Sequence, residues 1–365
     1  MMPKLNSTVS VVKISDTILE FFKTNTRQQV RIKVKDDSIL KIVCGLDGLR
    51  SIEEIAKENA VSLDELNPLL NFLRSKGILA NASPKEAFDE YEKFRRTIHF
   101  LEDFSISHDH LVHLWQNIQN AQVLIVGLGA VGSWVAANLV QSGVRNIILL
   151  DPDKVELSNL HRQFGYGESD IGRRKVDALA ERLHDFNHEM KVTKVYEMLD
   201  ADILDSFNDE KIDLIINCAD QPNVDTTSLW VGEYSMKRGI PHIVGGGYNL
   251  HLSLIGQSVI PGSSACVKCF QKQLEEENTI DINRVKKLTV SNRKVGSFGP
   301  MCSIIASMIG MEAIKILSED ITPANINRRG EFDIYTMDVT YKTFVRREDC
   351  EWCGHEGQYY HQGCL

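Results

Sequence analysis

The sequence has no apolar run near the roughly 18 residues that a membrane helix needs, and no tract rich in glycine, proline or serine. Its first residues, MMPKLNSTVSVVKI, lack the apolar core and cleavage site of a secretory signal. Basic residues are not in excess, because 41 Lys and Arg stand against 50 Asp and Glu, a net charge of −9. That sign disfavours general nucleic-acid binding. These absences exclude a membrane-spanning, fibrous or disordered protein, and we expect a cytoplasmic globular one.

Four of the eight cysteines form two C-x-x-C pairs, Cys266 with Cys269 and Cys350 with Cys353. In a reducing compartment such pairs indicate metal binding before a disulfide. Four thiolates can surround zinc as a tetrahedron, and a closed site of this kind is structural rather than catalytic. The alternative is four unrelated buried thiols.

With 365 residues the chain predicts two or three domains, and residues 1–80 have a pattern of their own. Val30–Lys35 alternates apolar and charged side chains, and Ser38–Cys44 offers a second strand, so we expect a hairpin. Two capping boxes then predict two short helices, Ser51 with Glu54 and Ser62 with Glu65, the second ending near Gly77. Hairpin and helices together predict a small winged-helix domain.

Residues 81–120 are charged and helical and predict a connector that leads into the next domain. From Ala121 to the apolar strand PHIVGGG, strands alternate with helices, which is typical of a mostly parallel α/β sheet covered on both faces, and after Pro261 the alternation loosens. We therefore expect a Rossmann-like domain over residues 121–365.

A glycine turn, Gly127-Leu128-Gly129-Ala130-Val131-Gly132, separates the first strand of this domain from its first helix. Such a turn lets backbone N–H groups approach a phosphate. Asp151 ends the next strand, 24 residues after Gly127, where a carboxylate can bind ribose hydroxyls. Taken alone, this pattern favours a nicotinamide or flavin dinucleotide.

The residues that follow favour a triphosphate instead. Two cations and two amides lie within 25 residues of Asp151: Asn159, Arg162, Gln163 and Lys175. Asp220 follows the apolar strand DLIINCA, where a carboxylate could hold magnesium or cap the next helix. Nucleotide-binding residues are therefore predicted at Gly127, Gly129, Gly132, Asp151, Asp153, Asn159 and Gln163.

The segments GLGAVGS, DPDKVELSNLHRQ, IGRRK and NCADQPNV, in this order, resemble the ubiquitin-activating type of adenylating enzyme, the ThiF/MoeB superfamily. The resemblance covers roughly Glu90 to Cys353 and implies ATP, Mg²⁺ and a structural zinc ion. It assigns ribose binding to Asp151, phosphate contacts to Asn159, Arg162 and Lys175, magnesium to Asp220, and zinc to Cys266, Cys269, Cys350 and Cys353.

The segment FRRTIHF resembles the part of this family in which an arginine crosses a homodimer interface to the partner's ATP. Arg95 is the matching position, with Arg96 as the alternative. The resemblance thus implies a homodimer in which Arg95, Arg162, Lys175 and Asp220 serve catalysis.

One departure from the family is informative. The segment FQKQLEEENTIDINRVKKLTVSNRKVGSFGP holds no cysteine where thioester-forming members often carry one. Cys302 follows in an apolar helix and is expected in the core. We therefore expect a nitrogen or carbon nucleophile to attack the activated carboxyl group directly.

The front segment GLDGLRSIEEIAKENAVSLDELNPLLNFLRSKGIL resembles PqqD-like domains, which bind the leader peptides of ribosomally made, modified peptides as an added strand. A DNA-binding domain is the alternative, but residues 1–90 carry 13 basic and 13 acidic side chains. Both halves together resemble the branch that matures microcin C and pantocin A.

This branch adenylates a carboxyl group of a precursor peptide, either a glutamate side chain, as in pantocin maturation, or the C-terminus, as in microcin maturation. We favour the glutamate side chain and expect the polar loop Gln271–Lys294 to cover the peptide. Three other functions stay open: activation of a ubiquitin-like sulfur-carrier protein, NAD-dependent oxidoreduction, and peptide binding without catalysis.

Overall fold

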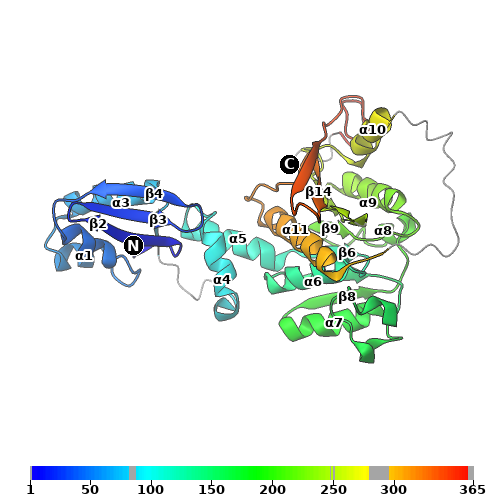
Figure 1. Ribbon diagram of the computed structural model, residues 1–365, viewed down its shortest axis with the longest axis horizontal. Helices are drawn as coiled ribbons and strands as arrows, with labels where there is room; N and C mark the ends of the chain where they lie inside the picture. Colours follow the sequence, from blue (N-terminus) through cyan, green and yellow to red (C-terminus); the bar gives the residue numbers. More distant parts are fainter. Residues whose placement is uncertain (1, 82–87, 247, 250, 279–295, 361–365) are drawn as a thin grey trace. The chain divides into compact units, whose positions relative to one another are not determined.

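The computed structural model describes residues 2–81, 88–246, 248–249, 251–278 and 296–360. The chain divides into two compact units, Met1–Gln116 and Asn117–Leu365, each with its own core. Figure 1 shows the elements of both units in sequence colours.

The first unit contains a three-stranded antiparallel sheet in the order β2-β3-β4. Its strands are β2 (Val9–Ser15), β3 (Ile18–Lys23) and β4 (Gln28–Lys33), and β1 (Pro3–Leu5) pairs separately with β5 (Leu79–Asn81). The helices that pack with this sheet are α1 (Ser38–Cys44), α2 (Ile52–Glu58) and α3 (Leu63–Ser75). Their shared core includes Phe21, Ile55 and Leu70. The winged-helix assignment of this unit stays a prediction.

The predicted hairpin between Val30–Lys35 and Ser38–Cys44 is wrong, because Ser38–Cys44 forms helix α1. The partner of β4 is the preceding strand β3, with Phe21 opposite Val30. Ile39, Ile42 and Val43 recur at helical spacing and face the core. A short apolar run fits a strand or a buried helix equally well, so periodicity alone could not distinguish the two.

Both predicted capping boxes are confirmed. The Ser51 hydroxyl accepts from the Glu54 N–H at 3.2 Å, and the Glu54 carboxylate accepts from the Ser51 N–H at 2.7 Å. Ser62 and Glu65 make the same reciprocal pair. The connector forms two helices, α4 (Tyr91–Glu102) and α5 (His108–Asn120), and the rings of Phe94 and Trp115 lie 5.2 Å apart between them.

The second unit is built on a six-stranded sheet in the order β13-β10-β9-β6-β7-β8. All neighbouring strands are parallel except β13, which pairs antiparallel with β10. The strands are β6 (Gln122–Val126), β7 (Asn146–Leu150), β8 (Lys191–Val195), β9 (Leu214–Asn217), β10 (His242–Val244) and β13 (Gln257–Val259). The expected mostly parallel α/β sheet is thereby confirmed. The chain reverses its direction of travel across the sheet between β6 and β9, which creates a switch point.

Helices cover both faces of this sheet (Figure 1). Contacts join α6 (Gly132–Gln141) to α7 (Lys175–Phe186) and α11 (Gly299–Ser318), and α8 (Ala201–Asp205) to α9 (Val224–Arg238). Helix α11 is long and apolar enough to cross a membrane by length and composition alone. More than half of its most apolar stretch is buried, and it packs against α6, as a helix of a protein core does.

A second, antiparallel sheet lies in the same unit, in the order β11-β12-β14-β15. Its strands are β11 (Tyr248–Asn249), β12 (Leu252–Leu254), β14 (Arg328–Asp333) and β15 (Val339–Thr343). Helix α10 (Val267–Asn278) and two 3-10 turns, η2 (Leu157–Asn159) and η3 (Glu168–Asp170), complete the described elements of this unit.

Candidate active site

The carboxyl ends of the parallel strands open onto a cleft of about 1210 Å³. Four of these strands continue directly into residues that line the cleft: Gly127 after β6, Asp151 after β7, Cys218–Asp220 after β9, and Gly245 after β10. Open α/β sheets bind ligands at this edge, beside the switch point.

The glycine turn is packed too tightly to hold side chains at two positions. Gly127 has φ +82°, and a Cβ there would lie 2.8 Å from the backbone of Cys218 and Ala219. A Cβ on Gly132 would lie 1.9 Å from the Gly127 carbonyl oxygen. Helix α6 begins at Gly132 with no side-chain cap and no acidic residue in its first turn. The N-terminal end of α6 is therefore suited to a phosphate.

Asp151 is fixed beside this turn. Its carboxylate accepts hydrogen bonds from the backbone N–H groups of Leu128, at 2.6 Å, and Asp153, at 2.8 Å. Burial raises the pKa of Asp151, while the nearby Lys175 ammonium acts in the opposite direction. A rigid, buried carboxylate at the end of β7 suits a ribose hydroxyl donor.

Lys175 brings a positive charge into the same cleft. It is the first residue of α7, its side chain is buried, and its Nζ lies 2.8 Å from the Asp153 carboxylate, which is exposed. Both residues line the cleft. The ammonium group is therefore held where it can contact a phosphate bound in the cleft.

Asn159, Arg162 and Gln163 are not among the residues that line the cleft, although Gln163 lies beside the glycine turn. Asn159 Oδ1 accepts from the Glu156 N–H at 3.0 Å, and Arg162 Nη1 donates to the Ser158 carbonyl. Gln163 is buried, and a Cβ on Gly129 would lie 4.0 Å from its Nε2. Among the described residues, Gln163 Oε1 and Arg162 Nε are buried without a hydrogen-bond partner. Such groups fit a polar ligand next to the turn.

Asp220 is exposed and lines the cleft after β9. The cap alternative for Asp220 is wrong, because Asn223 caps α9: its Oδ1 accepts from the Thr226 N–H at 2.9 Å. A second exposed carboxylate, that of Asp225, lines the same cleft. Carboxylate oxygens are the protein ligands that Mg²⁺ prefers, so the residues present fit the predicted magnesium site.

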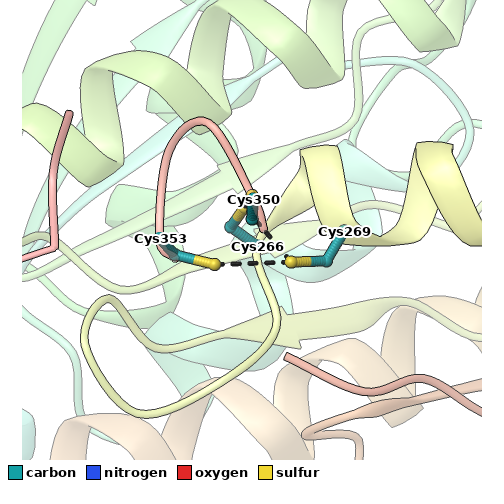
Figure 2. A group of neighbouring side chains, drawn as sticks. All are labelled: Cys266, Cys269, Cys350 and Cys353. Carbon is teal, nitrogen blue, oxygen red and sulfur yellow. Dashed lines mark hydrogen bonds between the residues drawn. The ribbon is translucent and has the colours of Figure 1, made fainter. Parts of the chain in front are cut away.

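The two cysteine pairs meet in one buried cluster (Figure 2). Sγ–Sγ distances are 3.5 Å for Cys266 and Cys350, 3.3 Å for Cys269 and Cys353, and 3.9 Å for Cys266 and Cys269. A zinc ion with four bonds of 2.3 Å places its sulfurs about 3.8 Å apart. The Cys266 thiol donates to Cys269 and lowers the pKa of the Cys269 thiol. The donor set fits zinc.

The remaining predicted residues have separate positions. Arg95 lies on α4 of the first unit, exposed, with Nη1 3.7 Å from the Glu92 carboxylate, and Arg96 beside it is also exposed. Cys302 is fully buried in the first turns of α11, as expected for a core residue, and burial raises the pKa of its thiol. The predicted polar loop Gln271–Lys294 is wrong for residues 271–278, which form the end of helix α10, and residues 279–294 lie outside the described part of the chain.

Several residues that line the cleft were not predicted. Met198 and Leu199 follow β8, so the rule that ligands gather at strand ends could have found them. Gln257 lies on the antiparallel strand β13, Phe270 on α10 and Arg329 on β14. These three carry no motif, and only the fold brings them to the cleft.

Comparison with known proteins gives a family and a fold. The profile of the ThiF family matches residues 104–353. The molybdopterin-synthase adenylyltransferase of Escherichia coli is 28% identical over 237 residues, which cover 65% of this chain and 88% of that protein. Escherichia coli MccB, solved with AMPCPP and MccA, covers 97% of this chain and 100% of its own at TM-score 0.74 and 21% identity. PaaA covers 92% of this chain and 99% of its own at TM-score 0.71 and 20% identity.

Proposed function

Since the chain belongs to the ThiF family, we propose that it adenylates a carboxyl group of a ribosomally made precursor peptide with ATP and Mg²⁺. A condensation within the peptide follows, on the way to a peptide-derived antibiotic. The enzyme works in the cytoplasm, where both the new peptide and ATP are found.

The choice of a peptide substrate rests on the presence of the N-terminal unit. The molybdopterin-synthase adenylyltransferase aligns with only 65% of this chain although the match takes in most of its own length. MccB and PaaA, in contrast, match the chain nearly from end to end. The shared extra unit supports a substrate that MccB is seen with, a peptide, rather than a folded carrier protein.

The first unit holds the leader of the peptide. In its three-stranded sheet, β2 and β4 each have one neighbouring strand among the described residues, so each presents an open edge. An extended peptide can add to such an edge through main-chain hydrogen bonds. This is the PqqD-like role that the sequence predicts for residues 1–80.

In the second unit, the residues of the cleft bind and orient ATP. The glycine turn receives the phosphates, Asp151 receives the ribose, and Lys175 and Arg162 balance negative charge that develops on the phosphates. Asp220 would hold Mg²⁺, which neutralises phosphate charge when bound. The peptide carboxylate attacks the α-phosphorus, pyrophosphate leaves, and the mixed anhydride is open to an internal nitrogen or carbon nucleophile.

The dimer and the zinc ion complete the proposal. Arg95 reaches the ATP of the partner subunit, and Cys266, Cys269, Cys350 and Cys353 hold zinc in a structural role. Mixing an Arg95→Ala chain with an Asp220→Asn chain tests the first point, because the mixed dimer has one intact composite site and should regain about a quarter of the activity. The same mixing with Arg96→Ala decides between the two arginines.

Activation of a sulfur-carrier protein is the second candidate, favoured by the alignment with the molybdopterin-synthase adenylyltransferase. Incubation with Mg-ATP and mass spectrometry separates the two. Peptides encoded by short reading frames beside the gene should change in mass and release pyrophosphate, whereas a small protein ending in Gly-Gly should form no adenylate. Thermal protection by NAD and none by ATP would instead support an oxidoreductase and overturn the proposal.

A further inference from the structure

The far end of the cleft contains a buried polar group that nucleotide binding does not use. In the sheet, Val126, Asn217, Val244 and Gln257 form one row across β6, β9, β10 and β13, because each is paired in register with the next. All four line the cleft. The row thus runs from the glycine turn, at the nucleotide end, to Gln257 at the opposite end.

Gln257 is 8% exposed, and its Nε2 has no hydrogen-bond partner among the described residues. A buried N–H donor without an acceptor is costly, and native structures rarely keep one without a reason. Since Gln257 also lines the cleft, an oxygen of a bound molecule can supply the missing acceptor.

The position of Gln257 identifies that molecule as the acyl substrate. Neighbouring strands lie about 4.8 Å apart, so Gln257 is roughly 14 Å from the strand that carries the glycine turn and roughly 10 Å from β9, which leads to Asp220. That distance is too long for a contact with the phosphates. The Gln257 side chain bridges part of this distance, and the residue that bears the activated carboxyl group can bridge the remainder.

The surroundings of Gln257 fit a peptide. Leu254 and Phe270 give the cleft apolar walls at this end, and Arg329 adds a cation whose Nη2 lies 3.8 Å from the Glu331 carboxylate. Leu274 and Arg329 also line a neighbouring hollow of about 260 Å³ over β14 and β15. Because the cleft and the hollow share these residues, the hollow offers a bound peptide room beyond the cleft, over the second sheet.

We propose that Gln257 is a specificity-determining residue, whose carboxamide N–H donates to a carbonyl or carboxylate oxygen of the residue that bears the activated carboxyl group. Arg329 marks the outer limit of this subsite. This role rests on the proposed adenylation, and it makes the Gln257 carboxamide the group that recognises the acyl half of the adenylate.

Stable mimics of the adenylate test this without knowledge of the natural peptide. Calorimetry compares 5′-O-sulfamoyladenosine with its N-acetyl, N-(γ-glutamyl) and N-(acetylglycyl) derivatives. The γ-glutamyl group offers a free carboxylate oxygen, and the acetylglycyl group offers a peptide carbonyl. Comparing these two derivatives shows which kind of oxygen accepts from Gln257. In the native protein at least one of them should bind about tenfold more tightly than the N-acetyl derivative.

Gln257→Leu should abolish this tenfold gain and leave the affinity for ATP and for 5′-O-sulfamoyladenosine unchanged. The variant should fold, because replacing an unpaired buried donor by an apolar group removes a cost, and its Tm should not fall. Gln119→Leu is the matched control. Gln119 lies on α5, away from the lining of the cleft, and it is buried with no partner for its Nε2 within the described part of the chain, so its loss should leave all affinities unchanged.

Two results overturn the inference: no derivative gains affinity over N-acetyl in the native protein, or the gain persists in Gln257→Leu. A different result would overturn the proposed function itself, namely that neither ATP nor 5′-O-sulfamoyladenosine binds the native protein. The two failures are therefore separable in one set of titrations.

Discussion

Lys175 and Asp153 form an unequal ion pair: the lysine side chain is 6% exposed and the aspartate side chain 61%, with 2.8 Å between Nζ and Oδ2. The cation is fixed by burial, whereas its partner can turn to solvent. A phosphate that enters the cleft can therefore replace Asp153 as the partner of Lys175 without any movement of the lysine.

Removal of the Lys175 ammonium should weaken nucleotide binding. We expect Lys175→Ala to bind Mg-ATP about 10- to 100-fold less tightly, because a charge-assisted contact to phosphate is lost. Calorimetry measures the change. Lys194→Ala is the control, since Lys194 makes a similar 2.8 Å pair with Asp177 that is not part of the cleft. Equal losses in both variants would contradict a phosphate contact at Lys175.

Asp220 should couple ATP binding to magnesium. In the native protein, added Mg²⁺ should increase the affinity for the non-hydrolysable analogue AMPCPP. In Asp220→Asn, this magnesium-dependent increase should be at least tenfold smaller. Titrations with and without Mg²⁺ give the two affinities. Asp202→Asn, on the exposed first turn of α8, should behave like the native protein. A magnesium effect that survives in Asp220→Asn would place the ion elsewhere.

The four-cysteine cluster should hold one zinc ion per chain. We expect metal analysis to find this ion, and Cys353→Ser to lose it and to lower Tm by several degrees, because structural zinc stabilises the fold directly. Cys44→Ser is the control, since Cys44 is an exposed free cysteine outside the cluster. Full stability of the metal-free protein would argue for four unbound thiols.

Stability should fall in acid because of His242. This side chain is fully buried on β10, its Nδ1 lies 2.6 Å from the Ser235 hydroxyl, and burial lowers its pKa to about 3. Below pH 6.5 the unfolded chain binds a proton at His242 that the folded chain does not bind until about pH 3. The free energy of unfolding should therefore decrease by about 1.4 kcal/mol per pH unit in this window from this group alone.

Urea unfolding between pH 7 and pH 4 measures the slope. His242→Gln keeps a polar side chain that does not titrate, so its slope should be shallower by about one proton. His188→Gln, a change in the loop before β8, should not alter the slope. An identical slope in the His242 variant would show that other groups cause the acid loss.

The sequence predicted the sheet domain well because its signals are local. Buried parallel strands read as continuous apolar runs, and the glycine turn between β6 and α6 has a fixed spacing to Asp151. Both capping boxes of the first unit were also visible, since each involves residues three apart. Gly127, Gly129, Asp151, Asp153, Lys175 and Asp220 meet in one cleft because strand ends converge at one edge.

What the sequence did not predict depends on tertiary contacts. The segment Ser38–Cys44 is apolar enough for either a strand or a helix, and only packing against α2, α3 and Phe21 decides. Gln257 reaches the cleft because β13 pairs antiparallel with β10, and nothing near it in the chain indicates that pairing. Its missing partner is visible only when every contact is known.

Helix α10 connects the four-cysteine cluster to the wall of the cleft. Cys269 of the four-cysteine cluster is followed directly by Phe270, and Leu274 lies one turn farther on, so one cysteine of the cluster and two residues of the cleft wall lie on the same helix. The nucleotide end, in contrast, rests on the turns after β6 and β7, remote from the sulfurs in the chain. Zinc limitation in the cell should therefore weaken binding of the proposed acyl substrate more than binding of ATP.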